Sequence, residues 1–148
     1  MTVDGLREML KRHEGYKRKP YFCAAGKKTI GVGWNMEAHR LPDDIAAFLR
    51  LHGCITDEMI ERLLTISLDS VMRDCREIFP EFASYTEGRQ AAIIDMTFQM
   101  GAGIWNGTTA DLIKAGKWSR AADRVKTWKY HRQTPERAEE NIALLRMG

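Results

Sequence analysis

The hydrophobic positions of this chain recur every three to four residues over most of its length, which is typical of amphipathic α-helices. The first run starts at Val3 and stops before Gly15, a residue that favours helix C-termini. The longest run has acidic residues in its first turn and stops before Pro80. Thr134 and Pro135 provide an N-cap and a first helical residue for the last run. These signals predict helices at about 3–14, 42–53, 56–78, 87–100, 108–115, 119–129 and 135–146.

One segment departs from the helical period. The sequences YKRKPYF and KKTIGVG are rich in β-branched and aromatic residues and are separated by a short AAG turn. Together with Pro20, they predict a small β-hairpin. With no internal repeat, the fold class is α+β and mainly α, with the strands segregated from the helices. The apolar stripe of the longest helix includes Cys75, so we expect that thiol in the core.

Composition narrows the class of protein further. The chain has 148 residues, of which 44% are hydrophobic and 29% charged, and this predicts one globular domain over 1–148 rather than a disordered chain. The longest uncharged stretch, 96–110, is shorter than the ~20 apolar residues that span a bilayer, so we expect no stable membrane insertion. The three cysteines and four histidines lack disulfide-framework or metal-ligand spacing, so we expect reduced thiols, no metal and no cofactor.

Charge is unevenly distributed along the chain. Residues 1–34 carry 8 basic and 3 acidic side chains, residues 35–90 carry 6 and 11, and residues 91–148 carry 9 and 6. Basic ends suit an anionic polymer, either a bacterial envelope or a nucleic acid, although a mixed solvated surface explains them equally well. No nucleic-acid-reading motif is present, so no nucleic-acid partner is expected.

The chemistry-bearing residues cluster around the predicted hairpin. HEG at 13–15 is followed by TIGVGWN at 29–35; eight residues separate Glu14 from Cys23, and five separate Cys23 from Thr29. In this the chain resembles the phage-type lysozymes of the T-even bacteriophage kind, which carry Glu, then Asp or sometimes Cys, then Thr at the same spacing. Later blocks are similar to that family in the same order, namely AAIIDMTFQMG, KWSRAAD and QTPERA.

The resemblance implies a glycoside hydrolase, a lysozyme with N-acetylmuramidase activity. Such a reaction needs an acid for the leaving oxygen and a second group that activates water or attacks the sugar. The resemblance assigns the acid to Glu14, the second group to Cys23 and placement of water to Thr29. A helix C-terminus disfavours negative charge and so eases protonation of Glu14. Taken alone, Glu14 is equally typical of a solvated helix end, and Thr29 of an ordinary strand.

Cys23 stands where an Asp is commoner. An ordinary thiol is mostly neutral at pH 7, but nearby cations stabilise a thiolate. We therefore hypothesise that Cys23 acts as a thiolate; the alternative is an inert hairpin thiol. The resemblance favours water activation with inversion over nucleophilic attack, although the residues alone leave both open. The neighbouring cations are Lys17, Arg18, Lys19, Lys27 and Lys28.

Other positions gain a role only through the resemblance. It implies pairing of Arg137 with the catalytic Glu, and places Asp95 and Gln99, four residues apart on one predicted helix, among secondary sites. Buried hydrogen bonding explains Asp95 and Gln99 equally well, and a core position explains Phe98. The implied substrate-binding residues are Asn35 or its neighbour Trp34, Phe98, Thr109 and Arg124.

The resemblance also implies a two-lobed architecture with a glycan-binding cleft. The expected parts are a small β-containing lobe at 14–56, a connecting helix at 57–79, and a helical lobe formed by 1–13 and 80–148. The expected substrate is the β-1,4 bond between N-acetylmuramic acid and N-acetylglucosamine in bacterial peptidoglycan. A monomer suffices for this chemistry.

The expected biological setting is bacteriolysis by a phage endolysin. The charged N-terminus lacks the apolar segment of a signal peptide, so we expect accumulation in the host cytoplasm, holin-dependent access, and action on the cell wall in the periplasm. A virion-associated muramidase shares the chemistry. A non-catalytic peptidoglycan-binding module that retains the lysozyme fold is the alternative from another class.

Overall fold

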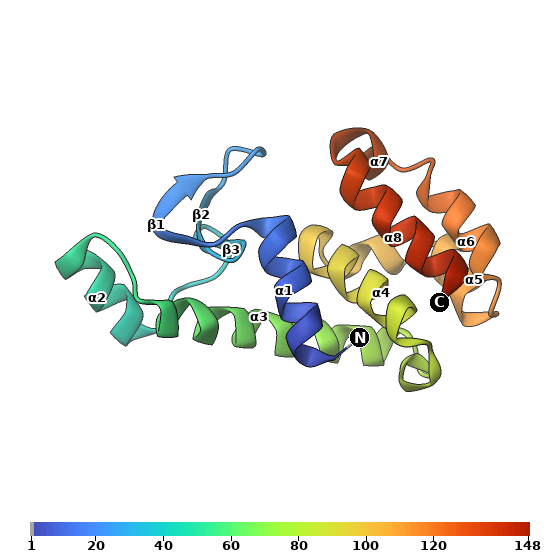
Figure 1. Ribbon diagram of the computed structural model, residues 1–148, viewed down its shortest axis with the longest axis horizontal. Coiled ribbons are helices and arrows are strands. Elements are labelled where there is room, and N and C mark those ends of the chain that lie inside the picture. Colours follow the sequence, from blue (N-terminus) through green and yellow to red (C-terminus); the bar gives the residue numbers. More distant parts are fainter. Residues whose placement is uncertain (1) are drawn as a thin grey trace. The chain divides into compact units, whose positions relative to one another are not determined.

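The computed structural model describes residues 2–148 and confirms an α+β fold that is mainly helical (Figure 1). None of the helices within that range is both long and apolar enough to cross a membrane. The strands are β1 (Lys17–Phe22), β2 (Lys28–Gly31) and β3 (Trp34–Asn35). The α-helices are α1 (Val3–Glu14), α2 (Asp43–His52), α3 (Asp57–Ile78), α4 (Glu87–Met100), α5 (Thr108–Lys114), α6 (Trp118–Val125), α7 (Lys129–Gln133) and α8 (Pro135–Met147), with short 3₁₀ helices η1 (Phe82–Ser84) and η2 (Ala102–Trp105).

The chain divides into two compact units. The N-terminal unit comprises Asp4–Asp69, and the C-terminal unit comprises Ser70–Gly148 with residues 2–3. The boundary falls inside α3, and residues 4–13 lie in the N-terminal unit rather than with the helical lobe expected for them. The reason is local pairing, because Arg7 and Lys11 on α1 donate to the carbonyl and carboxylate of Glu61 on α3.

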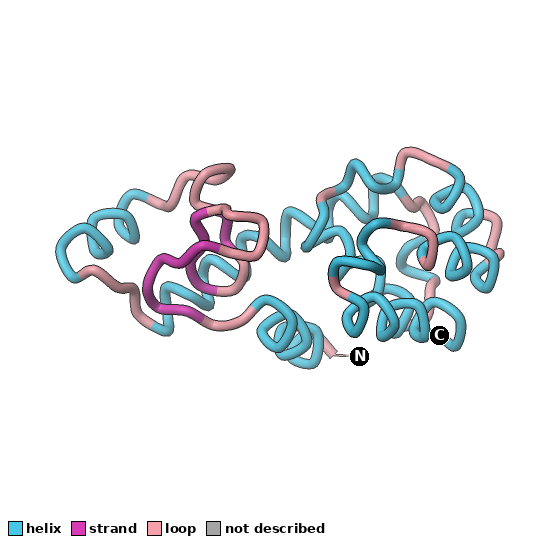
Figure 2. The backbone as a smooth tube through the Cα atoms, turned by 90° about the horizontal axis from the view of Figure 1, so that it is seen from above, coloured by secondary structure: helices cyan, strands magenta, loops and turns pink. Residues whose placement is uncertain are grey.

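The sheet of the N-terminal unit is antiparallel in the order β1-β2-β3, and Figure 2 shows the strands side by side. It contains the predicted hairpin, in which Tyr21 pairs with Thr29. The third strand, in which Trp34 lies opposite Ile30, was not predicted. Two residues are too few to show the alternation of buried and exposed side chains that indicates a strand. Thr29 therefore lies on the central strand, between Tyr21 and Asn35.

Helix ends in the N-terminal unit follow the local signals closely. Gly15 adopts a left-handed conformation and its N–H donates to the carbonyl of Lys11, so α1 ends at Glu14 as predicted. The apolar face of α1 is buried, and the first half of α3 buries its own stripe. The residues concerned are Leu6, Met9 and Leu10 on α1 and Ile60, Leu63, Leu64 and Leu68 on α3.

The C-terminal unit is built around α4. Seven consecutive residues of this helix, 91–97, are buried, so it is enclosed on all sides although two of them, Asp95 and Thr97, are polar, and α8 packs against it. Cys75 is 0% exposed, as predicted, and its thiol donates to the hydroxyl of Thr97 at 3.6 Å.

One prediction in this unit was wrong, and another is confirmed only in part. The helix expected over 119–129 ends at Val125, and α7 begins only at Lys129. Trp128 adopts an extended conformation, with its ring 5.8 Å from that of Trp105, so packing of two indoles interrupts the helical period. Thr134 occupies the N-cap position of α8, with Pro135 following, but its hydroxyl donates to the carbonyl of Tyr130 instead of capping.

Candidate active site

Cys23 is the first residue of a tight loop between β1 and β2. Its N–H donates to the carbonyl of Lys27 at 3.0 Å, and its carbonyl accepts from Gly26 at 2.8 Å. Gly26 supplies the left-handed conformation that this turn requires. The backbone N–H groups of Ala25 and Lys27 bond the Cys23 sulfur. An Asp at the first position of such a turn accepts the same kind of N–H bond, so the loop suits either residue.

The pKa of the Cys23 thiol is lowered from its ordinary value. Burial raises it, but the backbone N–H groups of Lys27 and Ala25 and the hydroxyl of Thr29 together lower it by more. The predicted direction therefore agrees with the structure while the predicted cause does not, because hydrogen bonds rather than lysine charges stabilise the thiolate. Arg18, one of the expected cations, is bound to the Asp57 carboxylate at 2.7 Å.

Thr29 is 4% exposed and contributes its hydroxyl to this loop. That hydroxyl donates to the carbonyl of Lys27 at 2.9 Å and also bonds the Cys23 sulfur. A hydroxyl has one proton, so the two acceptors compete for it. A thiolate is the stronger acceptor because it is charged, and ionisation of Cys23 therefore draws the Thr29 proton toward sulfur.

Glu14 is the last residue of α1 and is half-buried. The Tyr21 hydroxyl donates to its backbone carbonyl at 3.3 Å. Burial first, and then the charges of Glu14 and Cys23, raise the pKa of Tyr21. The Tyr21 ring thus lies within electrostatic reach of both residues. On another side, the Glu14 carboxyl lies against the backbone of Gly33, where an added Cβ would be 2.9 Å from Oε2.

Trp34 and Asn35, the alternative substrate contacts, occupy β3. Trp34 is only 6% exposed, and its indole N–H donates to the carbonyl of His39 at 3.2 Å, so the side chain is part of the core. Asn35 is half-buried, and its side-chain oxygen accepts the N–H groups of Glu37 and Ala38. Of the two, Asn35 retains the larger exposed surface.

Asp95 and Arg137 form a buried ion pair in the C-terminal unit. Asp95 is 0% exposed and accepts two bonds from the Arg137 guanidinium, at 2.9 and 3.0 Å. The Asn141 amide donates to Asp95 and to the hydroxyl of Tyr130, both at 2.8 Å. Burial raises the pKa of Tyr130 to about 12. For Asp95, buried hydrogen bonding is the interpretation that the structure supports. The pairing of Arg137 with Glu14 stays a prediction.

The remaining predicted residues lie on α4, α5 and α6 of the C-terminal unit. Gln99 donates to the hydroxyl of Thr134 at 3.4 Å, while its buried Oε1 has no hydrogen-bond partner. Phe98 is half-buried on α4 and Thr109 is buried near the start of α5. Arg124 is exposed at the end of α6. Their roles in substrate binding stay predictions.

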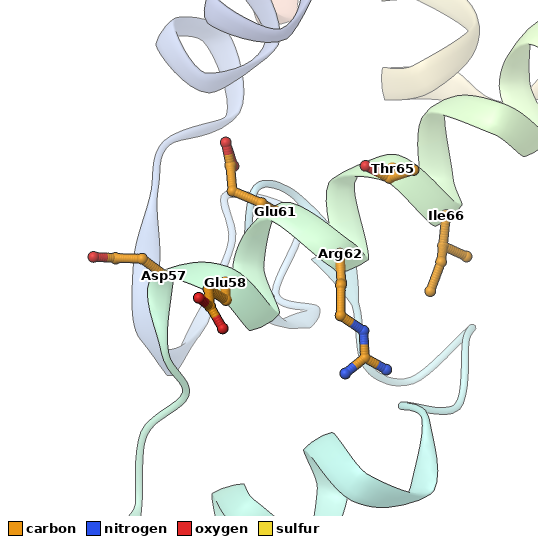
Figure 3. Close-up of a pocket in the computed structure, with 6 residues that line it drawn as sticks. All are labelled: Asp57, Glu58, Glu61, Arg62, Thr65 and Ile66. Atoms are coloured by element: carbon orange, nitrogen blue, oxygen red, sulfur yellow. The ribbon is translucent and has the colours of Figure 1, made fainter.

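A surface hollow of the N-terminal unit lies along α3 (Figure 3). Three of its charged lining groups are paired, since Asp57 binds Arg18, Arg62 binds Asp44 and Glu61 binds Lys11, whereas Glu58 is exposed. Within residues 2–148, no three His, Cys, Asp or Glu side chains gather as ligands for a metal ion. The lining residues are Asp57, Glu58, Glu61, Arg62, Thr65 and Ile66.

Two neighbours of Glu14 were missed from the sequence. For Tyr21 the sequence contained only a weak indication of proximity to Glu14, namely that its strand starts three residues after Glu14. For Gly33 the indication was clearer, because the motif GVG places two glycines within three residues of the hairpin. Glycines spaced so closely indicate a left-handed turn or a close approach of the backbone to another group.

Comparison with known proteins places these residues in a family. The model of the family described as phage lysozyme matches residues 11–140, which include Glu14, Cys23 and Thr29. "Probable T4-type lysozyme 1" of Dictyostelium discoideum is 30% identical over 165 aligned residues, covering 99% of this chain and 96% of that protein. "Pre-baseplate central spike protein Gp5" of Enterobacteria phage T4 is 27% identical over 97% of this chain, but over only 28% of its own length. The chain belongs to the phage lysozyme family, with the α+β, lysozyme-like fold expected of it.

Proposed function

We propose that this protein is a muramidase that hydrolyses the β-1,4 bond between N-acetylmuramic acid and N-acetylglucosamine in bacterial peptidoglycan. The observation that carries the proposal is the environment of Cys23. Its thiol lies at the family spacing from Glu14, and its pKa is lowered by N–H and O–H donors. Hydrolysis requires a base at this position, and a lowered pKa favours the ionised form of the thiol that can act as one.

In the proposed reaction Glu14 is the general acid and Cys23 the general base. The Glu14 carboxyl gives its proton to the glycosidic oxygen as the bond to the anomeric carbon breaks. A water molecule forms the new bond to that carbon and gives its proton to the Cys23 thiolate. The products are the two glycan ends, a Glu14 carboxylate and a neutral thiol, and exchange with solvent restores the starting protonation.

Thr29 supports the base in this scheme. When the thiolate forms, the Thr29 hydroxyl turns from the carbonyl of Lys27 to the sulfur and stabilises the negative charge. When the thiolate accepts a proton, the hydroxyl returns to the carbonyl. Placement of the attacking water by Thr29, which the family resemblance implies, belongs to the same proposal.

The setting that we propose is lysis of a bacterial host by a phage endolysin. The protein would then wait in the host cytoplasm and reach the wall through a membrane lesion made by a holin. A virion-associated muramidase is the second candidate. It is favoured by the similarity to a phage spike protein, of which this chain matches 28% of the length. Immunodetection of the chain in purified virions separates the two settings.

The test of the proposed reaction compares wild type with Glu14→Gln, Cys23→Ala and Cys23→Asp. Each protein is added to outer-membrane-permeabilised bacteria, and turbidity and released reducing ends are followed together. We expect hydrolysis by wild type and Cys23→Asp, because the loop donates to either side chain. Glu14→Gln and Cys23→Ala should be inactive. Full activity of Cys23→Ala would refute the assignment of the base.

The same experiment distinguishes a non-catalytic binding module. Such a protein would bind peptidoglycan without producing reducing ends, and Cys23→Asp would gain an activity that wild type lacks. Alkylation of Cys23 offers a check that needs no substitution at the site. In a Cys54→Ser, Cys75→Ala background it should abolish hydrolysis, because the thioether that forms accepts no proton from water.

A further inference from the structure

Gly33 makes an unusually close approach to the side chain of Glu14. A Cβ placed on Gly33 would lie 2.9 Å from Oε2, 3.0 Å from Cδ and 3.1 Å from Cγ of Glu14. Real Cβ atoms essentially never approach other heavy atoms within 3.0 Å. The Glu14 carboxyl therefore packs on the backbone of Gly33 at a distance that only glycine allows.

The backbone of Glu14 is anchored independently of this contact. The Gly15 N–H donates to the carbonyl of Lys11 at 2.8 Å and closes the last turn of α1. The Tyr21 hydroxyl donates to the carbonyl of Glu14 itself. The carboxyl that contacts Gly33 lies at the end of the side chain, beyond these backbone bonds. A methyl group on Gly33 would therefore rotate the carboxyl and leave the helix end in place.

From this geometry we propose that Gly33 is a positioning residue for Glu14. The missing Cβ leaves room for the observed orientation of the carboxyl, which lies against the Gly33 backbone. The inference rests on the proposed function, in which Glu14 protonates the leaving oxygen. Proton transfer requires hydrogen-bond distance and alignment, and a displacement of about 1 Å can cost roughly 100-fold in rate.

Gly31 provides a matched control. It has a φ of +66°, against +65° for Gly33, and lies two residues earlier in the same hairpin. A Cβ on Gly31 would meet only Ile60 and Leu63, at ordinary contact distances of 3.6 to 4.0 Å. Alanine at either position thus suffers the same kind of backbone strain. Only alanine at position 33 also collides with Glu14.

The kinetic test compares Gly33→Ala and Gly31→Ala on solubilised peptidoglycan strands, with reducing ends as the signal. For Gly33→Ala we expect kcat to fall about 10- to 100-fold with KM nearly unchanged, because the acid is misaligned while the glycan surface is intact. Gly31→Ala should keep kcat within about twofold of wild type. Equal losses of kcat in the two variants, or a change confined to KM, would overturn the proposal.

A spectroscopic test reports on the carboxyl without relying on activity. Proteins labelled with ¹³C at the glutamate carboxyl give a resonance for Glu14 that is identified by its loss in Glu14→Gln. Gly33→Ala should shift this resonance and Gly31→Ala should leave it in place. An unmoved resonance in Gly33→Ala would show that Gly33 does not set the carboxyl orientation.

The two tests separate this inference from the proposed function. If wild type releases no reducing ends, the proposed function fails and the catalytic consequence of Gly33 fails with it. The resonance comparison still decides whether Gly33 orients Glu14. If wild type is active and only the Gly33 comparison fails, the proposed reaction stands and the positioning role is overturned.

Discussion

The two units of this protein place thiol and carboxyl groups in opposite environments. In the N-terminal unit, hydrogen-bond donors lower the pKa of the half-buried Cys23 thiol. In the C-terminal unit, burial raises the pKa of Cys75 to about 11. The carboxyl groups differ likewise, since Glu14 is half-buried at a helix end, whereas Asp95 is fully buried and bound by Arg137.

This contrast shows how environment separates reactive groups from structural ones. A buried ion pair with good geometry cannot exchange protons easily, because neither member can lose its charge without stranding the other. A thiol that receives several N–H and O–H bonds, in contrast, has a lowered pKa, and Cys23 is only half-buried. Chemistry is therefore expected near Cys23 and Glu14, while Asp95 and Cys75 contribute to stability.

The largest expected effect is the loss of activity in Glu14→Gln. Removing a general acid costs between about 10²- and 10⁴-fold in rate. The variant should still fold, because glutamine has nearly the same shape and the backbone carbonyl of residue 14 still accepts from Tyr21. The measurement is reducing-end release beside a thermal melt. A variant that melts like wild type and hydrolyses at its rate would exclude Glu14 as the acid.

In the C-terminal unit, Asp95→Ala is expected to change stability rather than activity. It leaves the buried Arg137 guanidinium without its carboxylate, which should destabilise the protein by about 3–5 kcal/mol. The melting temperature should then fall by roughly 10 °C. Asp44→Ala removes the exposed partner of Arg62 and serves as control, with no measurable change expected. An unchanged melt for Asp95→Ala would contradict a structural role for the pair.

An intermediate effect is expected in thiol alkylation. Iodoacetamide at neutral pH should modify Cys23 well before Cys75, because thiolate is the reactive form and Cys75 is both buried and mostly protonated. Mass spectrometry of peptides taken at timed intervals measures the two rates. Cys75 should react only once the protein is unfolded. Equal rates in the native state would remove the contrast between the two units.

The smallest expected effect is that of Thr29→Val. Valine keeps the shape but removes a hydroxyl that lowers the pKa of Cys23. The pH at which Cys23 alkylation reaches half its maximal rate should therefore move upward. Thr29→Ser keeps the hydroxyl and should stay near wild type. A downward or absent shift in Thr29→Val would show that this hydroxyl does not stabilise the thiolate.

Much of the fold could be predicted from local signals. The helix α4 begins and ends at the predicted residues, because Thr86 caps its start and a glycine follows its end. The break between Val125 and Lys129 could not be predicted, since it depends on contact between Trp128 and Trp105, residues far apart in sequence. Likewise, the two-residue strand β3 exists only because it pairs with β2.

The candidate site was predictable to a lesser degree. Spacing and family resemblance predict Glu14, Cys23 and Thr29 as the catalytic residues, but the pKa of Cys23 is lowered largely by backbone N–H groups, which carry no residue signature. The close approach of Gly33 to Glu14 depends on how the hairpin packs on the end of α1. Such contacts follow from three-dimensional geometry, which a pattern of residue types does not contain.

The most direct test of the central claim is the pH dependence of kcat/KM for wild type and Cys23→Asp. If residue 23 is the base, activity rises with pH as this residue loses its proton. The ordinary pKa of an Asp carboxyl lies several units below that of a thiol. The account predicts that the rise moves to lower pH in Cys23→Asp. An identical rise in both proteins would show that some other group titrates, and would contradict Cys23 as the base.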